Sequence, residues 1–157
     1  MSSDIGNNDQ DEIENIKMKT LHEMQKQVKI QQAHTEALKA LGGKPIDLAD
    51  SNFFSEVSKY PLMLIDFWAP WCGPCRMVSP TVDQLAKQYS DKIAFGRVNV
   101  DENPMTASQF GIQGIPTLLI FQHGKAVDGL VGAYPKNMIE SRLKAHLGNS
   151  STTGAYQ

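Results

Sequence analysis

The pattern of apolar and polar positions changes near residue 43 of the 157-residue chain. Before that point Glu, Lys, Gln, Met and Ala dominate, and no aromatic residue precedes Phe53. These residue types favour helices, and the pair Gly42-Gly43 is a typical stop signal after a helix. We therefore predict one long helix from about Asp11 to Leu41, ahead of the rest of the fold.

The apolar residues of this predicted helix do not form a sustained seam. Leu21, Met24, Val28 and Leu38 fit heptad positions, but Gln31 and Thr35 occupy intervening positions of the same seam. A stable coiled coil needs apolar residues at most of these positions. The segment is therefore either a solvated extension or a helix that docks on a partner or on a second copy, and the sequence leaves both open.

Short apolar runs alternate with amphipathic segments between Pro45 and Leu147. The predicted strands cover residues 45–48, 62–68, 93–100, 117–122 and 126–131, and the predicted helices cover residues 50–57, 74–89, 105–110 and 136–147. Asp50 is the expected N-cap of the first of these helices. The run Leu62–Trp68 is almost continuously apolar, which is typical of a central strand covered on both faces. This order predicts an α/β fold with a central mixed β-sheet flanked by helices and preceded by the N-terminal helix.

Composition divides the chain into three expected parts. These are a helical extension (1–44), one domain (45–147) and a disordered tail (148–157) in which Gly, Ser and Thr cluster. The net charge is −2 and no basic stripe is present, which disfavours nucleic acid and anionic membranes as partners. No apolar run approaches the roughly 20 residues that span a bilayer, and the polar, acidic N-terminus does not resemble a secretory signal. We expect a cytoplasmic protein.

The chain has only two cysteines, Cys72 and Cys75. They are too close in sequence to staple a long loop, so they do not form a structural disulfide framework. A structural zinc site needs four ligands, but the chain has no second cysteine pair and its four histidines are scattered. No histidine lies in a setting that suggests pairing with Cys72 as in a cysteine protease. An incidental pair and the binding of another ligand stay open beside thiol–disulfide chemistry.

The surroundings of the two cysteines favour this chemistry. Cys72 follows the central apolar strand and opens the next predicted helix, and Pro74 suits the first turn of that helix. Unpaired N–H groups and the helix dipole stabilise a thiolate at Cys72, the expected nucleophile, while Cys75 is expected to be more buried and to resolve the mixed disulfide. Asp66 lies inside the apolar strand. Burial there raises the pKa of its carboxyl group and suits it to accept the proton of Cys75, unless it points outward at a strand edge.

Four segments occur in an order that resembles the thioredoxin family. They are Asp66-Phe67-Trp68-Ala69, Trp71-Cys72-Gly73-Pro74-Cys75, Ile115-Pro116-Thr117 and Val131-Gly132-Ala133. The resemblance extends from about Pro45 to Leu147 and implies the thioredoxin-like fold. It also implies a protein-disulfide reductase that a reductase re-reduces and that holds no cofactor beyond the redox-active Cys72–Cys75 disulfide. Disulfide-containing proteins are the implied targets.

The resemblance assigns roles to individual residues. Cys72 would attack, Cys75 would resolve, Asp66 would accept the proton and Pro116 would be a cis-proline facing the sulfur atoms, although the sequence alone leaves that bond open. The implied substrate groove is formed by Trp71, Gly73, Pro74, Ile115, Pro116, Val131, Gly132 and Ala133. Arg97 stands where the family often has Lys, and the extension has no counterpart in the family. A redox adaptor anchored to one partner complex by the N-terminal helix is therefore the alternative function.

Overall fold

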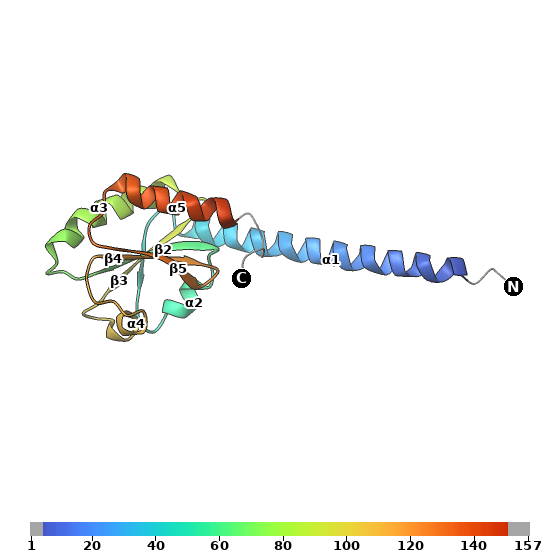
Figure 1. Cartoon of the computed structure of the whole chain (residues 1–157), viewed down its shortest axis with the longest axis horizontal. Helices are drawn as coiled ribbons and strands as arrows, with labels where there is room; N and C mark the ends of the chain where they lie inside the picture. The colour runs from blue at the N-terminus through green and yellow to red at the C-terminus, as the bar shows by residue number, and fades with distance from the viewer. Residues whose placement is uncertain (1–4, 151–157) are drawn as a thin grey trace. The chain divides into compact units, whose positions relative to one another are not determined.

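A computed structural model describes residues 5–150 of the chain (Figure 1). The elements in chain order are α1 (Ile5–Ala40), β1 (Ile46–Leu48), α2 (Phe53–Val57), β2 (Leu62–Trp68), α3 (Gly73–Gln88), β3 (Ala94–Asn99), α4 (Pro104–Gln109), β4 (Thr117–Gln122), β5 (Lys125–Val131) and α5 (Lys136–Ser150). The predicted order of strands and helices is confirmed. The first helix begins six residues earlier than predicted and the last extends to Ser150, while residues 151–157 of the expected tail lie outside the described part.

The chain divides into two compact units, one of residues 1–33 and one that begins at His34. In the first unit every described side chain from residue 8 to residue 33 is exposed. In the second unit the last turns of α1 contribute Leu38 to the core, with Ala37 and Leu41 packed against it. The core of the second unit therefore includes residues that precede the predicted boundary at residue 44. None of the described helices has the length and apolar character needed to cross a membrane.

The five strands form one mixed sheet in the order β1-β3-β2-β4-β5. β1, β3 and β2 run parallel, whereas β4 is antiparallel to β2 and β5 is antiparallel to β4. β2 is therefore the central strand, as its apolar run predicts. In the register of the sheet, Asp66 of β2 lies beside Arg97 of β3 on one side and Leu118 of β4 on the other. This register brings an acid and a base together in the middle of the sheet.

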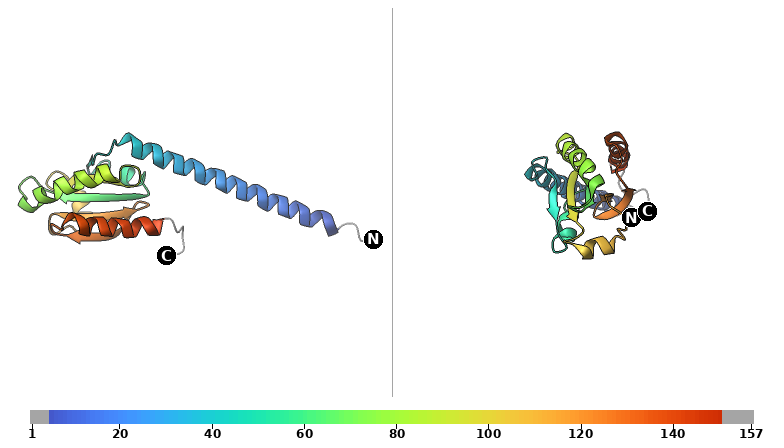
Figure 2. Two further views of the ribbon diagram at one scale, coloured as in Figure 1. Left: turned by 90° about the horizontal axis from the view of Figure 1, so that it is seen from above. Right: turned by 90° about the vertical axis from the view of Figure 1, so that its left-hand side faces the viewer.

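Helices cover both faces of the sheet, α3 and α5 on one face and α2 and α4 on the other (Figure 2). Side chains of β2 alternate between the two faces, as a pleated strand requires. Leu62 and Leu64 pack with α3 and α5, while Met63 and Ile65 join the core on the opposite face. Asp66 continues the alternation of Leu62 and Leu64, so its carboxylate lies on the face that α3 covers. α3, which begins next to Cys72, and the carboxylate of Asp66 therefore lie on the same face of the sheet.

Asp50 does not cap α2, so this prediction is wrong. The N-cap of α2 is Asn52, whose side chain makes no capping hydrogen bond. The carboxylate of Asp50 instead accepts hydrogen bonds from the N–H of Thr106 (2.8 Å), the hydroxyl of Thr106 (2.6 Å) and the N–H of Met105 (3.3 Å). The Thr106 hydroxyl is the main cause of the lowered pKa of Asp50. Asp50 therefore caps the N-terminus of α4, which a local reading of the sequence misses because the two partners are over fifty residues apart.

Candidate active site

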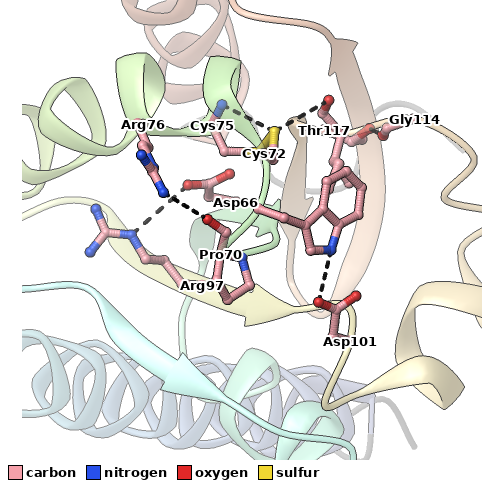
Figure 3. Close-up of a disulfide and its surroundings, with 11 residues drawn as sticks. Asp66, Pro70, Cys72, Cys75, Arg76, Arg97, Asp101, Gly114 and Thr117 are labelled. Atoms are coloured by element: carbon pink, nitrogen blue, oxygen red, sulfur yellow. Dashed lines mark hydrogen bonds and ion pairs between the residues drawn. A yellow bond between two sulfur atoms is a disulfide. The ribbon is translucent and has the colours of Figure 1, made fainter.

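Cys72 and Cys75 form a disulfide at the N-terminus of α3, with their Cα atoms 5.3 Å apart (Figure 3). Cys72 is the N-cap of the helix, with an extended backbone (φ −86°, ψ 111°), and Pro74 lies in the first turn. The N–H of Cys75 donates a hydrogen bond to Sγ of Cys72 at 3.2 Å. A helix N-terminus presents N–H groups that have no partner within the helix, so a thiolate at Cys72 would be stabilised there.

Burial does not distinguish the two cysteines in the disulfide form. Cys72 is 4% exposed and Cys75 is 3% exposed, so the expected deeper burial of Cys75 is not observed. Both pack in one small cluster with Ala69 and the partly buried Ile115. The asymmetry between the two sulfur atoms comes instead from their positions in the helix, because only Cys72 is the N-cap.

The peptide bond between Ile115 and Pro116 is cis, which answers the question that the sequence left open. The carbonyl oxygen of Ile115 lies 3.8 Å from Sγ of Cys72. Thr117 pairs with Val131 in the sheet, and the N–H of Gly132 donates to the carbonyl of Pro116 at 2.8 Å. Three segments that are far apart in sequence therefore meet around the disulfide.

The residues of the implied groove differ in exposure. Trp71 is 69% exposed and Val131 is 65% exposed, whereas Pro116 is buried. Gly73, Pro74 and Ala133 are exposed, and Ile115 and Gly132 are half-buried. The indole Nε1–H of Trp71 donates to Oδ2 of Asp101 at 2.9 Å, which fixes the direction of an otherwise exposed ring. Sequence reasoning did not identify Asp101, and only its place just after β3 connects it with the site.

Asp66 is buried, with 1% of its surface exposed, so the alternative in which it points outward is wrong. Neither of its carboxylate oxygens accepts a hydrogen bond from any residue in the described range. Burial raises the pKa of Asp66 to about 6, while the positive charge of Arg97 opposes this rise and the negative charge of Asp83 adds to it. The pKa of this acid therefore lies much closer to neutral pH than that of an ordinary aspartate.

Asp66 and Cys75 line the same cavity of about 100 Å³. Its other lining residues are Trp68, Ala69, Pro70, Arg76 and Ser79. Figure 3 shows the carboxylate of Asp66 between the cysteine pair and the side chain of Arg97. The cavity has room for a water molecule next to polar groups, which suits proton transfer between the carboxylate and a thiol.

This arrangement defines a class of protein. A disulfide between residues three apart, at the start of a helix whose neighbouring Trp71, Gly73 and Pro74 are exposed and next to a buried carboxyl group, is chemically suited to reversible exchange with other disulfides. A purely structural disulfide needs no such neighbours. The fold and the site together define a thiol–disulfide oxidoreductase.

The comparisons with known proteins give the family. The thioredoxin family model matches residues 44–145, and the chain belongs to the thioredoxin family. Thioredoxin 1 from Synechococcus elongatus is 54% identical over 101 residues, which are 64% of this chain and 94% of that protein. Thioredoxin 2 from Chlorobaculum tepidum is 49% identical over 109 residues, which are 69% of this chain and 100% of that protein.

A solved structure agrees with these sequence matches. A mutant thioredoxin from Halobacterium salinarum superposes with a TM-score of 0.63 at 32% identity, covering 67% of this chain and 92% of that one. The predicted thioredoxin-like fold is therefore confirmed. So is the predicted activity, that of a protein-disulfide reductase with a redox-active Cys72–Cys75 disulfide. A reductase as electron donor and disulfide-containing proteins as targets follow in general terms from the family.

Proposed function

We propose that the protein reduces target disulfides in two exchange steps, with Cys72 as the nucleophile and Cys75 as the resolving thiol. The position of Cys72 as the N-cap of α3 carries this assignment, because its Sγ accepts the N–H of Cys75 and a negative charge there is favoured. In the first step the Cys72 thiolate attacks a target sulfur. A bond forms between them, the target S–S bond breaks, and the leaving target sulfur takes the electron pair and then a proton.

In the second step Cys75 attacks Sγ of Cys72 and releases the second target thiolate. Cys75 must first lose its proton, and we assign Asp66 as the acceptor because both residues line one cavity and no other described carboxylate lines it. Two electrons pass from the dithiol to the target, and the Cys72–Cys75 disulfide is formed. A reductase returns two electrons and two protons and completes the cycle.

The proposed substrate groove surrounds this sulfur pair. It consists of Trp71, Gly73, Pro74, Ile115, Pro116, Val131, Gly132 and Ala133. Exposed apolar surface at Trp71 and Val131 supports the binding of a target there. An extended target segment would pair with the backbone of Ile115, whose carbonyl lies 3.8 Å from Sγ of Cys72, in the manner of an added strand.

We also propose that the protein acts in the cytoplasm, where thiols are kept reduced. Gly73 and Pro74 between the cysteines support this proposal, since the reducing members of the family carry the same pair. Thioredoxin has a potential of about −270 mV, which is close to that of a reducing cytosol.

Cys75→Ser tests the order of the two steps. We expect this variant to accumulate a mixed disulfide between Cys72 and a disulfide-bonded peptide, because attack proceeds and resolution does not. The adduct is measured by intact mass and mapped by proteolysis under non-reducing conditions. The double variant Cys72→Ser, Cys75→Ser is the control and should form no adduct. If Cys75→Ser forms none either, Cys72 is not the attacking thiol.

The second candidate function is that of a redox adaptor, and the exposed apolar side chains of α1 favour it. Between residues 8 and 33 they are Ile13, Ile16, Met18, Leu21, Met24, Val28 and Ile30, all of them solvent-exposed in the isolated chain. Because a solvated helix gains nothing from so many large apolar residues, we propose that α1 binds a partner or a second copy. The redox chemistry would then be delivered to one complex.

Deletion of residues 1–33 separates the two candidates. It keeps Leu38 and the rest of the second unit, so we expect reduction of a small disulfide to stay within about twofold of the full chain, because catalysis needs only the site on that unit. If α1 binds a second copy, the deletion should abolish self-association, measured by sedimentation. If α1 binds a partner, the deletion should abolish co-purification of one specific complex. If both measurements are unchanged, the adaptor function is rejected and α1 is a passive extension.

A matched pair of point variants refines this test. Met24→Glu and His22→Glu place the same charge on exposed positions that lie about 200° apart around the helix. Met24 shares a face with Ile13 and Val28, whereas His22 lies on the opposite face. Met24→Glu should therefore weaken docking and His22→Glu should not. Equal effects would contradict a docking face on α1.

A further inference from the structure

The guanidinium group of Arg97 is held by α3 rather than by Asp66. Its Nη2 donates to the carbonyl oxygen of Ser79 at 2.8 Å and to Oδ1 of Asp83 at 3.0 Å. Its Nε lies 3.9 Å from Oδ2 of Asp66, beyond hydrogen-bonding distance. Ser79 and Asp83 are one helical turn apart and present their acceptor atoms on the same side of α3. The two contacts therefore act together on one end of the guanidinium group.

Nε of Arg97 and the carboxylate of Asp66 form a long ion pair at 3.9 Å but make no hydrogen bond to each other. Within residues 5–150, Nε of Arg97 donates to no acceptor and both oxygens of Asp66 lack a donor, although all three atoms are buried. Such a pair would normally close to a charge-assisted hydrogen bond of about 2.8 Å, which satisfies both groups. A third group that holds the guanidinium back explains why the pair stays open.

We propose that Asp83 is a positioning residue for the exchange reaction: it holds the Arg97 guanidinium against α3 and so keeps the Arg97–Asp66 ion pair from closing to a hydrogen bond that would weaken Asp66 as a proton acceptor. The proposal rests on the proposed role of Asp66. Without Asp83, Arg97 is free to approach the carboxylate at Asp66 and stabilise its ionised form. A carboxylate so stabilised accepts a proton less readily from Cys75.

Few other charges face Asp66. Arg97 comes from β3, and Asp83 and the titratable Cys75 come from α3. Arg76, also on α3, lines the same cavity and directs its guanidinium to the carbonyl of Pro70 at 3.2 Å. The negative charge of Asp83 also raises the pKa of Asp66 directly, so the positioning effect and the charge effect have the same sign. A test must therefore separate the two.

Asp83→Leu is the test, because it removes both the charge and the hydrogen-bond acceptor at an exposed side chain while keeping a similar size. We expect the ionisation of Asp66, followed by carboxyl NMR, to move about one pH unit lower. The lower limb of the pH–rate profile for disulfide reduction should move with it, and the rate at pH 7 should fall about threefold, as a Brønsted coefficient near 0.5 implies. Asp83→Glu, which can still reach Arg97, should recover most of both shifts.

A double variant distinguishes positioning from the charge of Asp83 alone. In the background Arg97→Gln, adding Asp83→Leu should move the ionisation of Asp66 by less than half of its effect in the native background, because there is no guanidinium to release. An equal shift in both backgrounds, or no shift in the native one, overturns the proposal. A shifted Asp66 ionisation with an unmoved rate profile also overturns it. Trapping through Cys72 in the Cys75→Ser variant would still test the exchange mechanism separately.

Discussion

Cys72→Ser is expected to reduce the rate of protein-disulfide reduction by at least about a thousandfold. A serine hydroxyl is almost never ionised at neutral pH, and oxygen does not replace sulfur in an exchange reaction that forms and breaks S–S bonds. The variant also lacks the second sulfur needed to store the two electrons. The measurement is a single-turnover assay in which the fully reduced protein reacts with a disulfide-bonded peptide.

Cys75→Ser is the matched control for this prediction. It carries the same substitution three residues further along α3, yet it should consume one equivalent of peptide disulfide at a rate close to that of the native protein and then stop. Retention of more than a tenth of the native rate by Cys72→Ser would contradict the assigned nucleophile. A faster first attack in that variant than in Cys75→Ser would reverse the two roles.

Asp66→Asn is expected to slow disulfide reduction about tenfold or more near pH 7, because Cys75 then loses its acceptor. The deficit should be largest between pH 6, where the raised pKa of Asp66 lies, and about pH 8.5, where an ordinary thiol ionises unaided. Below pH 6 the native Asp66 is itself protonated, so the two proteins should converge. The measurement is the pH–rate profile of both proteins, and parallel profiles across this range would remove Asp66 from its proposed role.

The same variant has an opposite effect on stability. The folded-state pKa of Asp66 is raised from 3.8 to about 6. The folded protein therefore loses stability as the pH rises through this interval, because the carboxyl ionises in the unfolded chain while it stays protonated in the fold. Asp66→Asn removes that cost, and the free energy of unfolding at pH 7 should rise by about 3 kcal/mol. At pH 3.5 the two proteins should be nearly equally stable. Urea unfolding at the two pH values measures the difference, and Asp91→Asn, at an exposed acid, is the control.

The sequence predicted those features of the fold that local patterns determine. The bounds predicted for β2 agree with those observed, because a short and almost continuous apolar run is typical of a central strand that is covered on both faces. The same run favoured burial of Asp66 over an outward position at a strand edge, and the structure confirms the burial. The position of Cys72 at a helix start followed from Pro74 and from the strand before it.

Contacts between distant polar side chains were not predictable in this way. Asp50 was assigned to the nearest helix, but the packing of α4 beside it offered unpaired N–H groups of its own. The hold of Asp83 on Arg97 has the same origin, because it depends on how α3 lies over β3. When a polar side chain could bond to backbone groups of several helix turns, the folded arrangement decides which of them becomes its partner.

The burial of Leu38 has a consequence for where the chain can be cut without loss of the fold. The family match begins at residue 44. A protease that cut there would nevertheless remove Leu38 and its neighbours from the core and expose the apolar side chains of the sheet that they cover. Cleavage among the exposed residues before His34 would leave that cover intact. Limited digestion is therefore expected to leave the fold intact when the cut lies before His34 and to destabilise it when the cut lies at residue 44, because the end of α1 belongs to the core.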